Sequence, residues 1–207
     1  MITKFCSFPS SCNTYVLSSM GEALIIDFGA DGAAAVSFCA RHRLEIKAIL
    51  LTHGHFDHII GLPSVYGTGI PVYIDAEDEA QLGDGRLNGS IDLLGEPVLI
   101  DESKINACFV SEAMTIGRFE VKAIRTPFHT KGSVCYLVEG ENALFTGDTL
   151  FNLGIGRADL PHALPRKTEE SLRKIKVLDG GLSFYPGHGS GGKLSSQFLF
   201  NPYLKAI

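Results

Sequence analysis

The sequence predicts an α/β protein with two sheets between helices, in one domain over residues 1–207. A length of 207 residues suits one domain and allows a sizeable core to be buried. Hydrophobic residues make up 45% and charged residues 20%, which excludes a disordered chain, a collagen and a coiled coil. Each half of the chain also combines several short apolar segments with one or two amphipathic ones, and this pattern favours sheets covered by helices.

The first half opens with apolar segments separated by turn residues. They predict antiparallel strands over residues 2–8, 13–18 and 23–28. Asp31 is placed to cap a helix over residues 32–43, where alanines and a valine form an apolar stripe.

A short buried strand is then predicted over residues 47–51, followed by the polar segment 52–58 and a helix that reaches about Tyr66. Residues 71–74 form the next predicted strand. Residues 83–96 are rich in Gly, Asp and Asn, which predicts a loop.

The second half repeats this organisation. Strands are predicted over residues 119–126, 133–139, 142–148 and 182–189. The amphipathic segment 167–179 predicts a helix with Thr168 as its N-cap and Gly180 as its stop.

Charge, hydropathy and cysteine content indicate which kinds of partner the protein binds and in which cellular compartment it works. The net charge of −5 and the lack of a basic cluster argue against nucleic-acid binding. No window holds the roughly 18 consecutive apolar residues that span a bilayer, so no membrane association is expected. The N-terminus lacks the apolar core of a secretory signal, and the five cysteines are scattered and odd in number. We therefore expect a cytoplasmic protein, and the sequence leaves its oligomeric state open.

The polar segment after the strand at 47–51 carries a dense cluster of metal-binding residue types. Within six residues it contains His53, His55, Asp57 and His58. If the strand continues through residue 55, His53 and His55 point to one face and share an ion, while Asp57 and His58 follow the turn and face another. Imidazole and carboxylate together suit Zn²⁺, with Fe or Mn also possible.

Three later residues follow apolar strands in the same way. They are His129, Asp148 and His188, each preceded by a small residue, an aromatic residue or proline. Any one of them alone could be a loop histidine or a helix cap. Together with the first cluster, they supply the further ligands that one or two metal ions need.

These motifs resemble the metallo-β-lactamase superfamily. The resemblance rests on THGHFDHIIG, TPFHTKGS, FTGDTLF followed by GIGRADLP, and YPGHG, and covers nearly the whole chain. The group most similar is that of glyoxalase II, the hydroxyacylglutathione hydrolases. The resemblance implies an αββα sandwich of two similar halves with a two-metal site at one edge of the sheets.

The resemblance also implies a ligand set and a reaction. His53, His55 and His129 would bind the first metal, Asp57, His58 and His188 the second, and Asp148 would bridge both. The implied cofactor is a pair of Zn²⁺ ions. A metal-bridging hydroxide, oriented by Asp57, would attack the carbonyl of a small thioester or ester. A thiol leaves as thiolate without a general acid, which favours thioesters over amides.

Some residues depart from the family pattern. Phe128 and Lys131 stand where relatives carry a glycine and a proline, and His162 follows GRADLP where glycines are common. We take these three as candidate substrate-contacting residues. Full-length glyoxalase II also has a C-terminal helical region that contacts glutathione, and this region is not expected here, so the use of glutathione is open.

Alternative functions remain at this point. A mononuclear iron persulfide dioxygenase uses only the first ligand set, and a lactonase shares the fold. A flavodiiron reductase is disfavoured by His55, where that class has a glutamate. A β-lactamase is disfavoured by Asp148, where the broad-spectrum enzymes carry cysteine, and by the absence of an export signal.

Overall fold

The computed structural model describes residues 1–7 and 12–207, and within them the strands form two sheets of six. The first sheet runs in the spatial order β1 (Ile2–Phe5), β2 (Thr14–Ser19), β3 (Glu22–Ile26), β4 (Glu45–Leu50), β5 (Pro71–Ile74) and β6 (Asn106–Phe109). The second runs β12 (Gly192–Lys193), β11 (Ser183–Pro186), β10 (Ala143–Gly147), β9 (Val134–Val138), β8 (Phe119–Arg125) and β7 (Ala113–Ile116).

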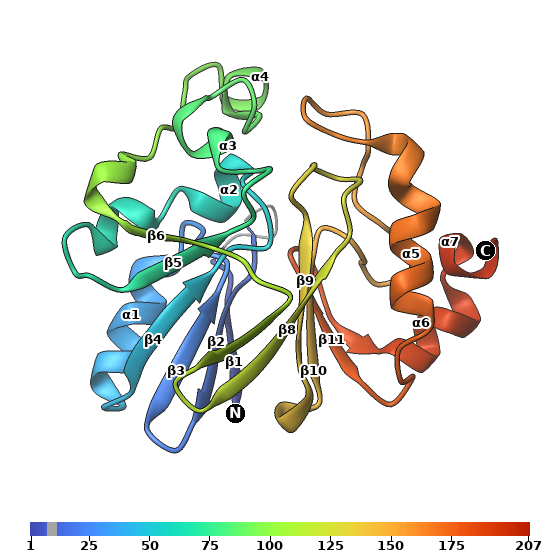
Figure 1. Ribbon diagram of the computed structural model, residues 1–207, viewed down its shortest axis with the longest axis horizontal. Helices are drawn as coiled ribbons and strands as arrows, with labels where there is room; N and C mark the ends of the chain where they lie inside the picture. Colours follow the sequence, from blue (N-terminus) through green and yellow to red (C-terminus); the bar gives the residue numbers. More distant parts are fainter. Residues whose placement is uncertain (8–11) are drawn as a thin grey trace.

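Helices cover the outer face of each sheet (Figure 1). The first half contributes α1 (Gly32–Arg41), α2 (Phe56–Ile59), α3 (Ala80–Gly83) and α4 (Ser90–Leu94). The second half contributes α5 (Thr168–Lys176), α6 (Leu194–Phe200) and α7 (Pro202–Lys205). Short 3₁₀ turns lie at Leu62–Val65, Glu102–Lys104, Glu139–Glu141 and Pro165–Lys167. The predicted α/β fold with two sheets between helices is confirmed.

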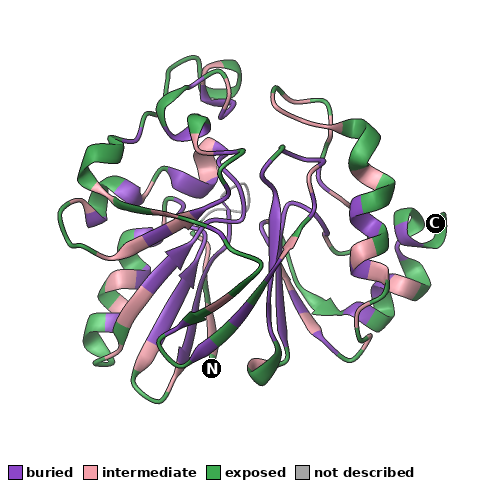
Figure 2. Cartoon of the chain, in the orientation of Figure 1, coloured by how far each residue is buried: buried purple, intermediate pink, exposed green. Residues whose placement is uncertain are grey.

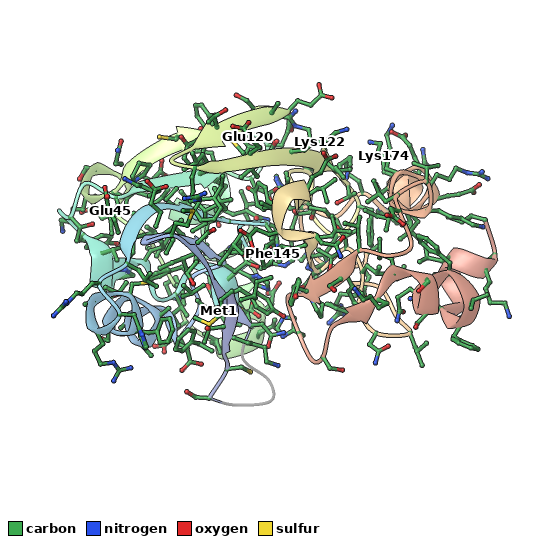
Figure 3. The ribbon with its side chains drawn as sticks, turned by 90° about the horizontal axis from the view of Figure 1, so that it is seen from below. Met1, Glu45, Glu120, Lys122, Phe145 and Lys174 are labelled. Carbon is green, nitrogen blue, oxygen red and sulfur yellow. The ribbon has the colours of Figure 1, made fainter. Side chains whose placement is uncertain are left out.

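Alternation along the strands explains why the sheets stack. In β3, Leu24 and Ile26 face the second sheet, while Ile25 between them packs under the helices of the first half. On the other sheet, β8 buries Phe119, Val121 and Ala123 against the first sheet and exposes Glu120 and Lys122, which point outward in Figure 3. Buried strands at the centre and exposed outer helix surfaces follow from this pattern (Figure 2).

The predicted strands agree with the structure to within a few residues at their ends. β1 to β3 pair antiparallel, as expected for the opening segments. The strand predicted over residues 2–8 ends at Phe5, and residue 8 lies outside the described residues. Asp31 occupies the N-cap position of α1 as predicted, but its side chain makes no capping hydrogen bond and accepts hydrogen bonds from Ser7 instead. Thr168 is the first residue of α5 rather than its N-cap, and its hydroxyl donates to the carbonyl of Pro165.

Several elements were not predicted. β6 and β7 are edge strands whose side chains are largely exposed, so their sequences carry no buried alternation. The loop predicted over residues 83–96 contains α4, which lies between Gly89 and Gly95, both with positive φ. The C-terminal helices α6 and α7 pack on the outer face of the second sheet through Leu194 and Leu204. Across the described part of the chain, no helix combines the length and apolar character that crossing a bilayer requires.

Phe145 tests how far the fold depends on the core between the sheets. Its ring is fully buried there, 5.6 Å from the Tyr15 ring and 5.2 Å from the Tyr185 ring. We expect Phe145→Ala to lower the free energy of unfolding by about 3–5 kcal/mol, because it removes buried surface and leaves a cavity. Leu199→Ala, at a side chain that is 63% exposed, should change it by less than about 0.5 kcal/mol. Urea unfolding followed by circular dichroism measures both, and equal effects would contradict this account of the core.

Candidate metal centre

The seven candidate ligands lie in the segments that follow four strands at one edge of the two sheets, and two of them, Asp57 and His58, belong to the short helix α2. His53, His55, Asp57 and His58 follow β4 of the first sheet. His129, Asp148 and His188 follow β8, β10 and β11 of the second. Both halves of the fold therefore contribute side chains to one place, and three overlapping groups of them are close enough to hold a metal ion.

The first group consists of three buried imidazoles. His53 Nε2 lies 3.1 Å from His55 Nδ1, which lies 2.9 Å from His129 Nε2. The sequence argument for this pair of histidines was wrong in one respect, because β4 ends at Leu50 and residues 52–55 are not a strand. An irregular loop, rather than strand alternation, brings the two rings together.

The other ring nitrogens determine which lone pairs face the centre. His129 Nδ1 donates to the carbonyl of Arg157 at 2.7 Å, which leaves its Nε2 as a bare acceptor. Thr52 Oγ1 donates to Asp27, so it can accept the proton of His53 Nδ1, 3.1 Å away, and leave His53 Nε2 bare as well. Two lone pairs therefore converge on a third imidazole, an arrangement that a divalent cation satisfies.

The second group combines carboxylates with imidazoles. Asp57 Oδ2 lies 3.1 Å from His188 Nε2 and 3.8 Å from His58 Nε2. Asp148 lies between the two groups: its Oδ1 is 3.5 Å from His58 Nε2 and its Oδ2 is 3.4 Å from His129 Nε2. His58 Nε2 and Asp148 Oδ1 are buried without a hydrogen-bond partner among the described residues, which also fits a cation at this place.

Asp27 was not singled out from the sequence, although it holds the first loop in place. Its carboxylate accepts hydrogen bonds from the Thr52 amide at 2.7 Å and from the Thr52 hydroxyl, and its Oδ2 lies 2.9 Å from His58 Nδ1. A proton on that nitrogen leaves His58 Nε2 free as a ligand. Asp27 directly follows β3, so the strand-end pattern that pointed to Asp148 could have found it.

A second buried carboxylate joins two ligand loops. Asp78 accepts hydrogen bonds from the Gly54 amide between His53 and His55, and from Thr130 Oγ1 and the Gly132 amide beyond His129. Burial raises the pKa of Asp78 despite these bonds. This residue therefore ties the loop after β4 to the loop after β8.

None of the three candidate substrate residues lines the cavity at the candidate ligands. Phe128, which precedes His129, is fully buried, and so it packs in the interior rather than forming a wall of the cavity. His162 Nε2 lies 2.7 Å from the carbonyl oxygen of Glu77 and 3.5 Å from Asp78. Lys131 is exposed. The described residues that line the central cavity include none of these three.

Burial sets the protonation of the first group. It lowers the pKa of His53 well below its usual range and that of His55 to about 3, so both imidazoles are neutral ligands at pH 7. Burial raises the pKa of Asp148, but the close approach of His58 and the charges of His58, His129 and His188 outweigh it, and the net pKa is lowered. For Asp57, too, the charge of His58 and the hydrogen bond to His188 outweigh burial and lower the pKa.

A cavity of about 700 Å³ opens directly above these ligands. His55, Asp57, His129, Asp148 and His188 all contribute to its floor. The rest of its lining is mainly apolar and comes from α2, α4 and the segment between β10 and α5. A metal ion at the floor would thus be open to a small molecule that enters the cavity.

Comparisons with known proteins agree with this geometry. The family model described as "Metallo-beta-lactamase superfamily" matches residues 8–188. The chain is 34% identical over 204 residues to the "Probable metallo-hydrolase YqgX" of Bacillus subtilis, covering 96% of this chain and 95% of that protein. It is 36% identical over 175 residues to a hydroxyacylglutathione hydrolase of Francisella tularensis, covering 84% of this chain and 61% of that protein.

A solved structure described as BLEG-1 B3 metallo-beta-lactamase superposes with a TM-score of 0.92 at 36% identity, covering 99% of each chain. These likenesses, together with the His/Asp cluster, indicate a divalent metal site without fixing the identity of the metal.

Asp27→Asn tests the role of the buried carboxylate beside His58. An asparagine tolerates the positive φ of 56° at this position, but its NH₂ group would face His58 Nδ1 and favour the ring proton on Nε2. We expect the affinity for the second of two metal ions to fall by about 10–100-fold, as for other lost partners of metal-binding histidines. Metal titration by calorimetry measures this. Asp101→Asn, at an exposed carboxylate, serves as the control; an unchanged second affinity in Asp27→Asn would contradict the assignment.

The lowered pKa of His55 predicts a pH dependence of stability for the metal-free protein. The unfolded chain binds a proton at His55 below about pH 6.5, whereas the folded protein resists it until about pH 3. The free energy of unfolding should therefore fall as the pH drops from 6.5 toward 4, by up to about 1.4 kcal/mol per pH unit from this group. The pKa values of His58 and His188 are raised, so these two groups change the free energy of unfolding only above about pH 6.5 and not in the range in which His55 acts.

Urea unfolding of metal-free protein between pH 7 and pH 4 measures the slope. His55→Gln should make it shallower, while His42→Gln, which removes an exposed histidine, should leave it as in the wild type. A wild-type slope in His55→Gln would show that His55 does not carry the effect.

Proposed function

The chain belongs to the metallo-beta-lactamase superfamily, and from that premise we propose that it is a two-metal hydrolase of small thioesters or esters. The observation that carries the proposal is the position of Asp148 between the two ligand groups, 3.4 Å from His129, 3.5 Å from His58 and 3.6 Å from His188, on the floor of an open cavity. His53, His55 and His129 would hold one ion, Asp57, His58 and His188 the other, and Asp148 both. Zn²⁺ suits this donor set, and Fe or Mn are further candidates.

The two ions would supply an activated water at neutral pH and polarise the carbonyl of the substrate. Asp57 faces the cavity with Oδ2 held by His188, so it can orient the attacking water and accept its proton. The water oxygen forms a bond to the carbonyl carbon, and the C–S bond breaks with its electron pair passing to sulfur. The products are a carboxylate and a thiolate, and the released protons reach solvent through the open cavity.

The leaving group favours thioesters and activated esters. A thiol has a pKa near 8.5 and departs as thiolate without an acid. The imidazoles around the cavity floor are all candidate metal ligands, so none is free to protonate an amine. The likeness to a hydroxyacylglutathione hydrolase supports the same substrate class.

The second ligand group distinguishes this proposal from a one-iron persulfide dioxygenase. Such an enzyme needs only the first group, whereas Asp57, His58 and His188 here form a complete second group beside it. A lactonase remains compatible with the same geometry because a lactone is an internal ester.

A second candidate function is the hydrolysis of β-lactams. It is favoured by the 36% identity over nearly the whole length to a protein described as a B3 metallo-beta-lactamase. The strained β-lactam amide needs less help with its leaving amine than an ordinary amide does. A chromogenic cephalosporin therefore belongs in the same set of assays.

We expect hydrolysis of small thioesters, with S-lactoylglutathione as the first one assayed, followed by loss of thioester absorbance, with about two metal ions per chain in the same sample. A chelator should abolish turnover and added Zn²⁺ should restore it. Asp57→Asn should lower kcat by about 10²–10⁴-fold while keeping the circular dichroism spectrum, because the water loses the group that orients it.

Asp101→Asn provides the matched control and should retain wild-type turnover. If simple thioesters or lactones are hydrolysed and S-lactoylglutathione is not, the hydrolase proposal stands and glutathione is excluded as the thiol carrier of the substrate. A single bound iron with no hydrolysis of any thioester, ester or lactone would overturn it and favour the dioxygenase. Wild-type turnover in Asp57→Asn would exclude the role given to that carboxylate.

A further inference from the structure

We propose that the substrate of this site carries an apolar acyl group, an aliphatic or aryl chain, bound between α4 and the segment 151–160. This inference rests on the proposed hydrolase function and specifies its substrate class. It is carried by two facing apolar walls above the ligands and by the charge of the cavity lining.

The first wall belongs to α2 and α4. Phe56 and Ile60 adjoin the ligand loop after β4, and Leu93 and Leu94 continue the wall outward. Ile60 is 38%, Leu93 57% and Leu94 49% exposed, so these large apolar side chains face open space. Exposed apolar side chains gathered in one concave surface beside a reactive centre mark a binding site for an apolar group.

The second wall comes from the segment between β10 and α5. Phe151, Ile155 and Leu160 line this side of the cavity. The Phe151 ring lies 6.0 Å from the His188 ring, so this wall begins beside the ligands. In Figure 1, α4 and the chain leading into α5 stand on opposite sides of the upper part of the molecule.

Hydrogen bonds of the buried Asn88 hold α4 in its position. The Asn88 side chain donates to the carbonyls of Gln81 and Val98 and accepts from the Ser90 amide, and the Asn88 carbonyl accepts from the Phe56 amide. Asn88 is fully buried. This anchor joins α4 to α2 and holds Leu93 and Leu94 beside the ligand loop, so the wall exists before any ligand binds.

The walls above the metal ligands offer little positive charge to an anionic substrate moiety. Among the described residues around the cavity, Arg157 is the only one with a permanent positive charge. Its guanidinium binds both carboxylate oxygens of Asp159, at 2.7 and 2.8 Å, and is thus already paired. Glutathione carries two carboxylates, for which this lining offers no unpaired arginine or lysine, whereas a hydrocarbon chain needs none.

The test is a series of S-acyl-N-acetylcysteamine thioesters with acetyl, butyryl, hexanoyl and octanoyl groups, compared with S-lactoylglutathione. The full chain is used in its metal-loaded form. We expect kcat/KM to rise about two- to fourfold for each added methylene, since each buries apolar surface against the two walls. The octanoyl thioester should exceed S-lactoylglutathione.

Two double variants, one on the α4 wall and one outside the cavity, test the contribution of α4. Leu93→Ser with Leu94→Ser should lower the octanoyl-to-acetyl ratio of kcat/KM at least tenfold. Leu199→Ser with Phe200→Ser alters two side chains on α6 that are 63% and 67% exposed and do not line the cavity, and should leave the ratio and the turnover unchanged. Both pairs are exposed, so loss of folding does not confound the comparison.

Binding of the thioethers S-octyl- and S-ethyl-N-acetylcysteamine, measured by calorimetry, separates the two proposals. Hydrolysis without a rise along the acyl series, or a preference for S-lactoylglutathione, overturns the apolar acyl group and keeps the hydrolase. If no thioester, ester or lactone is hydrolysed, the hydrolase proposal fails. Tighter binding of the octyl than of the ethyl compound, lost in the α4 variant, then still supports the apolar site, and equal binding of the two compounds overturns it.

Discussion

Three buried imidazoles that converge on one point with more acceptors than donors between them are the constraint on which this structure depends. His53, His55 and His129 lie within 3.1 Å of their neighbours, and burial keeps the first two neutral. In the absence of a cation such an arrangement costs free energy, because buried acceptors lack donors. Metal binding recovers that cost, so the affinity for metal and the stability of the fold are linked.

The core between the sheets supplies the rigidity that this arrangement requires. Four ligands come from the first half of the chain and three from the second, so any sliding of one sheet over the other would separate them. Interdigitated side chains such as Tyr15 and Phe145 resist that movement. Asp78 adds a direct tie, since it binds the amides of Gly54 and Gly132 in loops from opposite sheets. Core packing and the hydrogen bonds of Asp78 thus both keep the ligands of the two sheets at a fixed distance from each other.

The sequence predicts the elements of this protein in which apolar residues are buried and polar residues mark the ends of the buried segments. The central strands are continuous apolar runs, and the seven candidate ligands stand out because polar side chains follow such runs. β6 and α4 were missed because their side chains are half exposed, so tertiary contacts rather than periodicity decide their structure. Asp27 stands at a strand end as the ligands do, but its role depends on Thr52, 25 residues away. Asn88 was missed because its role depends on backbone groups that no local pattern reveals.

Reaction and specificity are assigned to different parts of the fold. The ligands sit at strand ends that the two sheets hold rigidly, and a change there alters the chemistry. The walls of the cavity belong to α4 and to the segment before α5, and the apolar side chains that these elements present to the cavity can change without removing a metal-binding group. A shared metal centre is therefore compatible with different substrates across relatives, and the substrate of this chain has to be argued from its own walls. Leu93, Leu94 and Phe151 make those walls apolar, and the pairing of Arg157 with Asp159 leaves them without a free cation to attract an anion.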